Sequence, residues 1–380
     1  MKILYAALKY DYGDPRRGLS FEHYNFFDSL LNMGHDLIYF DFASVARDRG
    51  REFMNRRLLE LVTVEKPDIM FSVLFRDEFD PAVIQRISRD SQTTTVNWFC
   101  DDHWRFDDFS SRWAPKFNWV VTTAASALPR YSQLGFKHVI KSQWACNHFL
   151  YRKLDLPDRY DATFVGMPHG DRPHIVQLVR DAGIDLRVWG KGWSEGRLSQ
   201  EEMIRVFGQS RVNLNLSNSS NKPGLKARTC GLLQRTIVQL PMSHSVRGAL
   251  LRGIARLECG TPTATATGYA EQIKGRNFEI PGCGGFTLTG LAEDLSDYYK
   301  PGRDVACFST PDELVRRLRH YLAHEDERRA IAESGYQRTL RAHTYVHRFV
   351  EIFNTMGFAS QPASDLIATG PRHGAVFEVG

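Results

Sequence analysis

The sequence contains no long apolar run. Its N-terminal segment, MKILYAALKYDYGDPRRG, carries only a short apolar stretch, which is too short for the core of a signal peptide or for a membrane span. No other part of the chain approaches the ~18 apolar residues that a membrane helix requires. We therefore expect a soluble protein that has no membrane span, is not exported and resides in the cytoplasm.

Paired cysteines are missing as well. The chain has 6 cysteines, at positions 100, 146, 230, 259, 283 and 307, and none of them stands in a Cys-x-x-Cys pair. No histidine spacing typical of a zinc site accompanies them. Scattered single cysteines are typical of a reducing compartment, so we expect neither a structural disulfide nor a bound zinc ion.

The chain also lacks a strong excess of charge of one sign. Its formal net charge is +5 and its pI is about 8.8. Such a mildly basic balance permits an acidic partner but does not require one. With 380 residues and 42% hydrophobic content, the chain is long enough for two domains of ordinary size.

Strand and helix signals alternate over the first 150 residues. We predict strands at 2–8, 36–42, 69–74, 94–99, 119–123 and 139–142, with helices that include 21–33 and 51–62. Mostly apolar strands separated by helices are typical of a parallel sheet covered on both faces. Residues 1–150 are therefore predicted to form a first Rossmann-like α/β domain.

The alternation restarts after the polar stretch 151–161, and a hinge is expected within 148–161. We predict strands at 162–165, 186–189 and 212–216, and helices at 173–182, 200–207, 311–323 and 326–341. Ser199 and Glu202 form a capping box at the start of the helix 200–207. Residues 160–342 are therefore predicted to form a second Rossmann-like domain.

Three segments depart from this alternation. Residues 218–268 are rich in Lys and Arg and contain no acidic residue before Glu258, which indicates a basic insertion in the second domain. It is either a solvated surface around a helix or two, or a contact for an acidic acceptor. Residues 343–357 contain an amphipathic helix at 344–356, and residues 358–380, rich in Gly, Ser and Pro, are predicted to be a loose tail.

Ligands of open parallel sheets bind beyond the carboxyl ends of the strands. By that rule, the first candidate ligand site follows the predicted strand 94–99. Asp101, Asp102 and His103 are three titratable groups in a row there, suited to acid/base catalysis on an acceptor hydroxyl. Two alternatives remain open. One is a helix N-cap formed by Asp101 or Asp102, and the other is a metal site of the paired aspartates for a sugar diphosphate.

A second stretch is GMPHGDR, residues 166–172, which joins a predicted strand to a helix. Gly166 and Gly170 permit close approach of the backbone to a ligand, and the N-terminus of a helix favours anions. Arg172 is placed to hold a phosphate through two hydrogen bonds. Many strand–helix loops carry these residue types, so this stretch alone does not establish a phosphate site.

A third stretch, QIKGRNFEIPGCGGF at residues 272–286, has the densest set of suitable groups. Lys274 and Arg276 can neutralise the charge that develops on a departing nucleoside diphosphate. Glu279 can accept hydrogen bonds from both ribose hydroxyls, and Gly284 and Gly285 let backbone N–H groups approach phosphates. The plain alternative is the start of a helix followed by a glycine turn.

On these residues the sequence resembles the CgeB-like (spore maturation protein-like) glycosyltransferases of the GT-B superfamily. The resemblance extends from about 162 to 348 and is carried by FVG…GDR, VWGKGW, KGRNFEIPGCGGF, YYKPGRDVACFSTPDEL, ERRAIAESGYQRTL and HTYVHRF. The N-terminal half is similar more loosely, through GHDLIYFDF and NWFCDDHW. The resemblance implies a GT-B fold, in which two Rossmann-like domains face each other across a cleft.

The resemblance also implies roles for individual residues. Glu279 matches the later of two glutamates, which contacts the nucleotide ribose, and Glu271 has the spacing of the earlier one near the donor sugar, without its Gly-Phe context. Lys274, Arg276 and Arg172 would hold the diphosphate. His103 is the best match to a histidine beside the donor sugar, and the helix within 343–357 would return to the first domain.

The predicted activity is transfer of a sugar from a nucleotide-diphosphate-sugar to an unidentified acceptor, which the first domain holds, after closure of the cleft has excluded water. Basic side chains and a helix N-terminus would stabilise the departing diphosphate, so neither a cofactor nor a metal is expected. Three alternatives remain. They are a nucleotide-sugar epimerase on the same fold, a catalytically silent nucleotide-sugar-binding protein, and a nucleic-acid glycosylating enzyme that uses the basic insertion.

Overall fold

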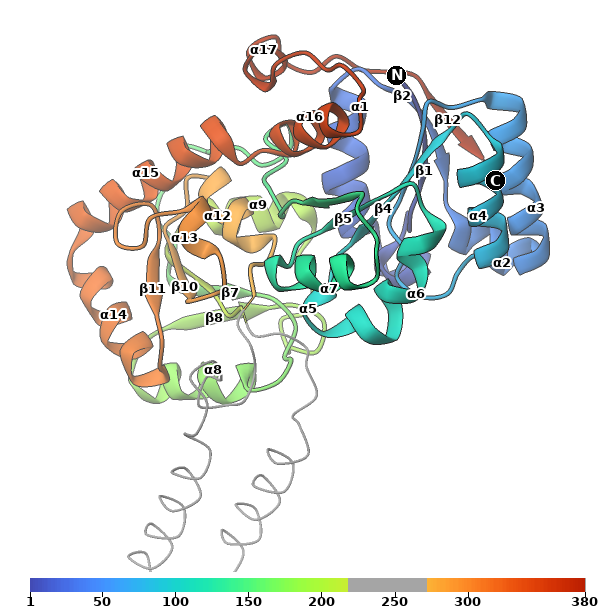
Figure 1. Cartoon of the computed structure of the whole chain (residues 1–380). Helices are drawn as coiled ribbons and strands as arrows, with labels where there is room; N and C mark the ends of the chain where they lie inside the picture. The colour runs from blue at the N-terminus through green and yellow to red at the C-terminus, as the bar shows by residue number, and fades with distance from the viewer. Residues whose placement is uncertain (218–271, 380) are drawn as a thin grey trace, which may run out of the picture. The chain divides into compact units, whose positions relative to one another are not determined.

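The structure is a computed structural model, and it describes residues 1–217 and 272–379. The chain divides into two compact units (Figure 1). The first unit contains Met1–Arg152 and Thr339–Gly380, and the second contains Lys153–Arg338. The chain thus leaves the first unit inside the stretch expected to hold the hinge. The predicted insertion 218–268, and with it the predicted contact for an acidic acceptor or a nucleic acid, lies outside the described residues.

The first unit is built on a seven-stranded parallel sheet with the strand order β12-β2-β1-β3-β4-β5-β6. Successive side chains of a strand point to opposite faces. In β1, Ile3 and Tyr5 therefore belong to one hydrophobic core, and Leu4 and Ala6 belong to a second core on the other face. The strands are β1 Lys2–Ala6, β2 Asp36–Phe40, β3 Ile69–Ser72, β4 Thr94–Phe99, β5 Trp119–Thr122, β6 Val139–Lys141 and β12 Val376–Val379.

Helices cover both faces of this sheet, as the apolar strands require. One core takes side chains from α2 Phe42–Arg49, α3 Arg51–Glu65, α4 Pro81–Asp90, α6 Ser111–Trp113 and α7 Leu128–Gln133. The other core takes them from α1 Asp28–Asn32, α16 Tyr345–Thr355 and α17 Ala363–Ala368. A π-helical stretch, His23–Phe27, precedes α1, and α5 Asp102–Arg105 follows β4. The predicted helix 344–356 therefore packs on the first unit as α16.

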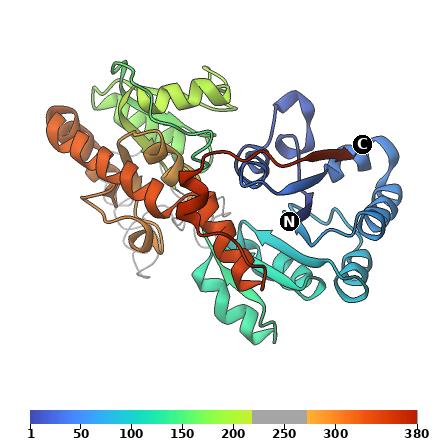
Figure 2. The ribbon, with the colours of Figure 1, turned by 90° about the horizontal axis from the view of Figure 1, so that it is seen from above.

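The prediction of a loose C-terminal tail is wrong. Residues Val376–Val379 form β12, which pairs in parallel with Leu37–Phe40 of β2 and becomes the edge strand of the first sheet (Figure 2). The Nζ of Lys9 lies 2.7 Å from a carboxylate oxygen of Glu378 and ties the new strand to the loop after β1. Backbone pairing, rather than apolar burial, orders this segment, because Val376 and Phe377 remain exposed.

The second unit contains a five-stranded parallel sheet with the strand order β11-β10-β9-β7-β8. Its strands are β7 Tyr160–Val165, β8 Leu186–Trp189, β9 Ser210–Asn215, β10 Thr287–Gly290 and β11 Ala306–Phe308. Its helices are α8 Arg172–Asp181, α9 Gln200–Gly208, α12 Arg276–Gly282, α13 Leu295–Tyr298, α14 Pro311–Ala323 and α15 Glu325–Ala342, which continues into the first unit. Apolar residues of α8, α14 and α15 pack on one face of this sheet.

Local signals explain where several of these helices begin. The predicted capping box is confirmed, since the Ser199 hydroxyl accepts from the Glu202 N–H and the Glu202 carboxylate accepts from the Ser199 N–H. In α14, Thr310 caps the N–H of Glu313 and Pro311 stands in the first turn. Among the described residues, no helix is both long and apolar enough to cross a membrane.

Candidate functional site

Two of the predicted stretches meet at the carboxyl edge of the second sheet. Residues 166–172 leave this edge at the end of β7, which ends at Val165. The segment that leads into α12 begins at the same edge, because the Gln272 N–H donates to the Ser217 carbonyl at 3.1 Å, just beyond β9. This is the edge at which open parallel sheets bind their ligands.

Basic groups gather in this region. Burial, and then the positive charges of Arg172 and Lys274, lowers the pKa of His169. Arg172 and the segment that carries Lys274 reach the same place, because the Arg172 guanidinium donates to the Leu216 carbonyl and the Gln272 N–H donates to the Ser217 carbonyl. His169 was not predicted as a site residue, because the pattern GMPHGDR indicated a phosphate contact only through its glycines, its arginine and the helix N-terminus that follows.

Gly166 is fixed by contacts with the segment after β8. Its carbonyl accepts from the Trp193 Nε1–H at 2.7 Å, and its N–H donates to the Trp189 carbonyl at 2.8 Å. Gly190 has a φ of +145°, and a Cβ there would lie 2.3 Å from the Gly166 carbonyl oxygen. The VWGKGW segment therefore shapes the turn that begins the candidate phosphate loop.

Arg172 has a structural role of its own. Its guanidinium donates to the Met167 carbonyl at 3.0 Å and to the Leu216 carbonyl at 2.6 Å, and so joins the loop to the end of β9. It also lies over the Phe164 ring, 5.5 Å from the centroid. The predicted contact of Arg172 with a phosphate would have to coexist with these backbone contacts.

Glu279 and Arg276 are paired with each other. The Glu279 side chain is fully buried, and the Arg276 guanidinium donates to its Oε2. Arg276 is 27% exposed and lies 5.6 Å from the centroid of the Phe207 ring. Because Arg276 and its surroundings cover the carboxylate, a ribose can reach Glu279 only after the arginine has moved. Glu271, the other predicted glutamate, lies outside the described residues.

A buried polar network, which the sequence analysis missed, supports the start of α12. The Asn215 amide donates to Asn277 at 2.8 Å and to Thr289 at 3.1 Å, and Ser217 lies 3.0 Å from Thr289. The Asn277 Oδ1 also accepts from the Lys274 N–H at 2.9 Å. All four side chains are almost completely buried. The network therefore holds the backbone of Lys274 at the carboxyl ends of β9 and β10.

Gly284 and Gly285 lie at the other end of α12, just before the first residue of β10 and hence at the amino edge of the sheet. Gly284 has a φ of +74°, and a Cβ on it would lie 2.8 Å from the Lys153 side chain. A Cβ on Gly285 would lie 2.8 Å from the Phe207 carbonyl oxygen. Close packing explains both glycines, and their position argues against the predicted contact with phosphates.

The three catalytic candidates of the first unit do not form one cluster. Asp102 is 1% exposed, and its Oδ2 accepts from the Tyr131 hydroxyl at 2.7 Å. Burial raises the pKa of this carboxyl. Asp102 therefore points into the core, which argues against both the acid/base role and the paired-aspartate metal site. His103 is half-buried in the first turn of α5.

Asp101, by contrast, lines a small cavity at the carboxyl edge of the first sheet. The cavity has a volume of about 30 Å³, roughly the space for one water molecule. Glu22, which the sequence analysis did not select, contributes a second carboxyl group. The remaining lining residues are Leu8, Val73, Leu74, Phe75, Phe99, Cys100, Arg105, Phe109 and Ser110.

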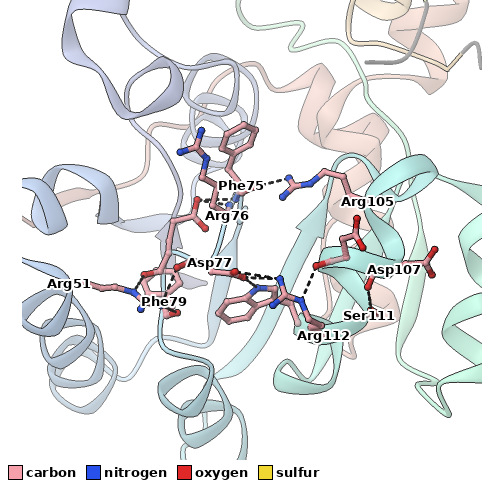
Figure 3. A network of polar contacts seen from close by, with 12 residues as sticks. Arg51, Phe75, Arg76, Asp77, Phe79, Arg105, Asp107, Ser111 and Arg112 are labelled. Atoms are coloured by element: carbon pink, nitrogen blue, oxygen red, sulfur yellow. Dashed lines mark hydrogen bonds and ion pairs between the residues drawn. The ribbon is translucent and has the colours of Figure 1, made fainter. Parts of the chain in front are cut away.

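Hydrogen bonds hold the loop after β3 against this cavity (Figure 3). The Arg105 guanidinium donates to the Phe75 carbonyl at 2.7 Å, and Arg51 donates to the carbonyls of residues 77–79. The Trp113 Nε1–H donates to the Asp77 carboxylate at 2.7 Å. Contacts from three different helical segments thus fix one wall of the cavity. Within residues 1–217 and 272–379, no three His, Cys, Asp or Glu side chains are grouped to hold a metal.

The chain is similar in sequence to one protein family. Residues 172–240 and 249–354 match the family described as glycosyl transferase-like. These residues include Arg172, Lys274, Arg276 and Glu279, whereas Gly166 and His169 lie just before the match. No curated protein is significantly similar to the chain.

Solved structures show the same fold over nearly the whole chain. The structure of HepE from Anabaena in complex with UDP-glucose matches with a TM-score of 0.60 and 10% identity, over 94% of this chain and 99% of that one. Sucrose-phosphate synthase from Thermosynechococcus elongatus matches with a TM-score of 0.56 and 10% identity, over 94% and 97%. The lipopolysaccharide outer core galactosyltransferase WaaB matches with a TM-score of 0.52 and 11% identity, over 94% and 99%.

Identities of this size establish the fold alone, and that fold is the predicted GT-B fold with two Rossmann-like sheets. The family match is a similarity in sequence, not only in fold, and it includes basic residues of the second unit. It therefore indicates the class of enzyme. Family and fold together confirm the predicted enzyme class: the chain is a glycosyltransferase with the GT-B fold.

Proposed function

We propose that this protein transfers a sugar from a nucleotide-diphosphate-sugar to an acceptor hydroxyl, and that the donor binds at the carboxyl edge of the second sheet. The observation that carries the proposal is that Arg172 and the segment of Lys274 meet just beyond β9: the Arg172 guanidinium donates to the Leu216 carbonyl at 2.6 Å, and the Gln272 N–H donates to the Ser217 carbonyl at 3.1 Å. Two cations beside the end of β7 suit a diphosphate, whose charge they would partly neutralise.

The proposal also names a donor and a subfamily. The presence of UDP-glucose in the HepE structure makes a uridine diphosphate sugar the first donor to test. The motifs around Glu279 support membership of the CgeB-like glycosyltransferases. We propose the cytoplasm, where sugar nucleotides are synthesised, as the site of action, and we leave the acceptor open among glycans, proteins and other hydroxyl compounds.

The proposed chemistry needs neither a metal nor a cofactor. As the acceptor oxygen forms its bond to the anomeric carbon, the bond from that carbon to the diphosphate oxygen breaks. Negative charge then develops on the departing diphosphate, where Lys274 and Arg172 supply fixed positive charge. Arg276 would turn from Glu279 toward the diphosphate, and the released carboxylate of Glu279 would accept the ribose hydroxyls.

A thermal-shift panel of nucleoside diphosphates and their sugars, each with Mg²⁺ or with EDTA, tests the donor site. We expect one base to raise the melting temperature with either addition, because a ligand that binds only the folded state stabilises it. Lys274→Ala should weaken binding of that ligand about 10- to 100-fold, the equivalent of one charge-assisted hydrogen bond at ~1.5–3 kcal/mol.

Lys300→Ala is the matched control, because Lys300 is an exposed lysine of the second unit that lies shortly before β11, at the amino edge of the sheet. It should bind the ligand as the wild type does. If no compound of the panel shifts the melting temperature, or if Lys274→Ala binds as tightly as Lys300→Ala, the donor site is not where we place it.

A further inference from the structure

Three aromatic side chains gather at the carboxyl edge of the first sheet. Tyr12 belongs to the loop after β1, Phe75 to the loop after β3, and Trp104 to α5, which follows β4. These three strands are neighbours in the sheet, in the order β1-β3-β4. Tyr12 is 50% exposed, Trp104 is 39% exposed and Phe75 is half-buried. We call these three residues the aromatic shelf.

Contacts between rings and a guanidinium group hold the aromatic shelf together. The rings of Tyr12 and Phe75 meet edge to face, with 5.3 Å between their centroids. The Arg105 guanidinium lies 5.7 Å from the centroid of the Phe75 ring and 5.6 Å from that of the Trp104 ring. Its hydrogen bond to the Phe75 carbonyl is drawn in Figure 3. The protein itself therefore fixes the position of the shelf across three separate segments.

The backbone of Tyr12 is strained, although its ring is half exposed. Tyr12 has a φ of +53° and a ψ of +25°, in the left-handed region that residues with bulky side chains rarely adopt. The Arg17 guanidinium lies 4.3 Å from the centroid of the Tyr12 ring and pairs with the Asp11 carboxylate at 2.8 Å. Strained backbone conformations are concentrated at functional sites, where the surrounding structure holds them. Tyr12 therefore has the features of a binding residue.

Charged groups of both signs stand among the rings. The guanidinium groups that lie against them belong to Arg17, Arg76 and Arg105. The carboxyl groups on the same loops include Asp11, which pairs with Arg17, and Glu22 and Asp101, which line the small cavity together with Phe75. A polyanion would meet these carboxylates. The hydroxyl groups of a neutral sugar, by contrast, can donate to a carboxylate and accept from a guanidinium group.

The alternation of rings and charges also argues against a protein partner. The core of a stable protein interface is depleted of charged residues. On the aromatic shelf, Arg105 lies against both Phe75 and Trp104, and Arg17 lies against Tyr12. No exposed ring of the shelf is therefore free of a charged neighbour. A sugar chain has the matching pattern, because apolar C–H faces and hydroxyl edges alternate along it.

We propose that the aromatic shelf binds a neutral glycan. On the basis of the proposed transferase function, the acceptor then belongs to the glycans rather than to proteins or small hydroxyl compounds. The C–H faces of the sugar rings pack on Tyr12 and Trp104, where burial of apolar surface stabilises the complex. The hydroxyl groups bond to the neighbouring carboxyl and guanidinium groups. All of these residues belong to the first unit, so binding needs no sugar nucleotide.

A microarray of immobilised neutral and anionic glycans, probed with the full chain in the absence of sugar nucleotide, tests this binding. The neutral oligosaccharide that gives the strongest signal is then titrated by calorimetry. We expect the Kd to rise at least about 10-fold in Tyr12→Ala and in Trp104→Ala, the loss typical of an aromatic anchor. Added salt should change the Kd little, because the ligand carries no charge.

Two further variants of Tyr12 separate binding from folding. Tyr12→Phe keeps the ring and should bind the oligosaccharide nearly as the wild type does. Tyr12→Gly removes the ring and suits a positive φ, so it should keep the melting temperature of the wild type while it loses the oligosaccharide. Phe377→Ala is the matched control, because Phe377 is an aromatic residue of the first unit that is 60% exposed but lies on the edge strand β12. It should bind as the wild type does.

The proposal is overturned if no neutral glycan binds, or if only anionic glycans bind and salt abolishes their binding. It is also overturned if Tyr12→Gly and Trp104→Ala bind as tightly as Phe377→Ala. Release of nucleoside diphosphate marks the difference from a failure of the proposed function. A wild type that releases it from a sugar nucleotide but binds no neutral glycan keeps the transferase assignment and loses the glycan site. A wild type that binds a glycan through the shelf but turns over no sugar nucleotide keeps the glycan site alone.

Discussion

Gly285 occupies a position where even a methyl group does not fit. A Cβ there would lie 2.8 Å from the Phe207 carbonyl oxygen and 2.9 Å from the Asn213 amide, and neither atom can move without disturbing a strand or a helix. Gly285→Ala should therefore destabilise the protein by about 1–3 kcal/mol, the usual cost of overpacking. Urea unfolding of the second unit measures the change.

Gly208→Ala provides the control, since the atom nearest to a methyl group added there, the Leu154 carbonyl oxygen, would be 4.0 Å away. At the end of α9, alanine should be neutral or stabilising by up to about 1 kcal/mol. Equal stability of the two variants would contradict the packing role of Gly285.

The sequence shows which polar residues follow a predicted strand. It does not show whether their side chains point into the core or toward a ligand. Lys274 could be selected because a cation beyond a strand suits a diphosphate. The direction of Asp102 could not be predicted, because Tyr131, whose hydroxyl binds it, is distant in the sequence. Glu22 was missed for a similar reason, since its place at the cavity depends on how the loops after β1 and β3 meet the end of β4.

At the scale of elements, β12 is the part of the fold most open to a direct test. Removal of residues 374–380 should expose the edge of β2 and remove a row of backbone hydrogen bonds, at about 1 kcal/mol each. We expect a melting temperature lower by several degrees, by about 2–4 °C per kcal/mol lost, and faster aggregation on heating. Calorimetry and light scattering measure the two effects.

Glu378→Ala separates the strand from its ion pair. The Glu378 side chain is 59% exposed, so its contact with Lys9 should contribute at most about 1 kcal/mol. The variant should therefore melt much closer to wild type than the truncated chain does. A truncated chain with wild-type stability would show that β12 adds nothing to the first sheet.

Elements with strong local signals were predicted well. The strands Thr94–Phe99 and Leu186–Trp189 and the helix Pro311–Ala323 have the predicted bounds, because apolar runs and a capped start mark them. β12 was missed because a segment of four residues after a Gly- and Pro-rich stretch has too weak a pattern to predict a strand. They become a strand only through pairing with β2.

For the whole molecule, the central claim is that the donor binds to one unit. Hydrogen exchange with and without a saturating amount of the selected nucleoside diphosphate tests it. We expect slower exchange at 166–172 and 272–279, because bound ligand orders both segments, and little change at 73–80 of the first unit. Protection confined to the first unit would contradict the assignment.

The two-unit α/β architecture could be predicted because alternating strands and helices restrict the topology to a few parallel arrangements. The contents of the donor site could be predicted only as a set of residue types. The pairing of Arg276 with Glu279 and the buried network of Asn215, Asn277 and Thr289 depend on which strands are neighbours, and a single sequence does not specify this.

The place of α16 and β12 in the first unit has a consequence for biosynthesis. A ribosome that has translated residue 152 has not yet made α16, which supplies Phe349 and Phe353 to one of the two cores. At ~5–20 residues per second, that core waits for about 10–40 s, while the whole second unit and α16 are translated. The unit whose synthesis begins first is therefore the last to become complete. During that interval its apolar face is uncovered, and a chaperone can bind it.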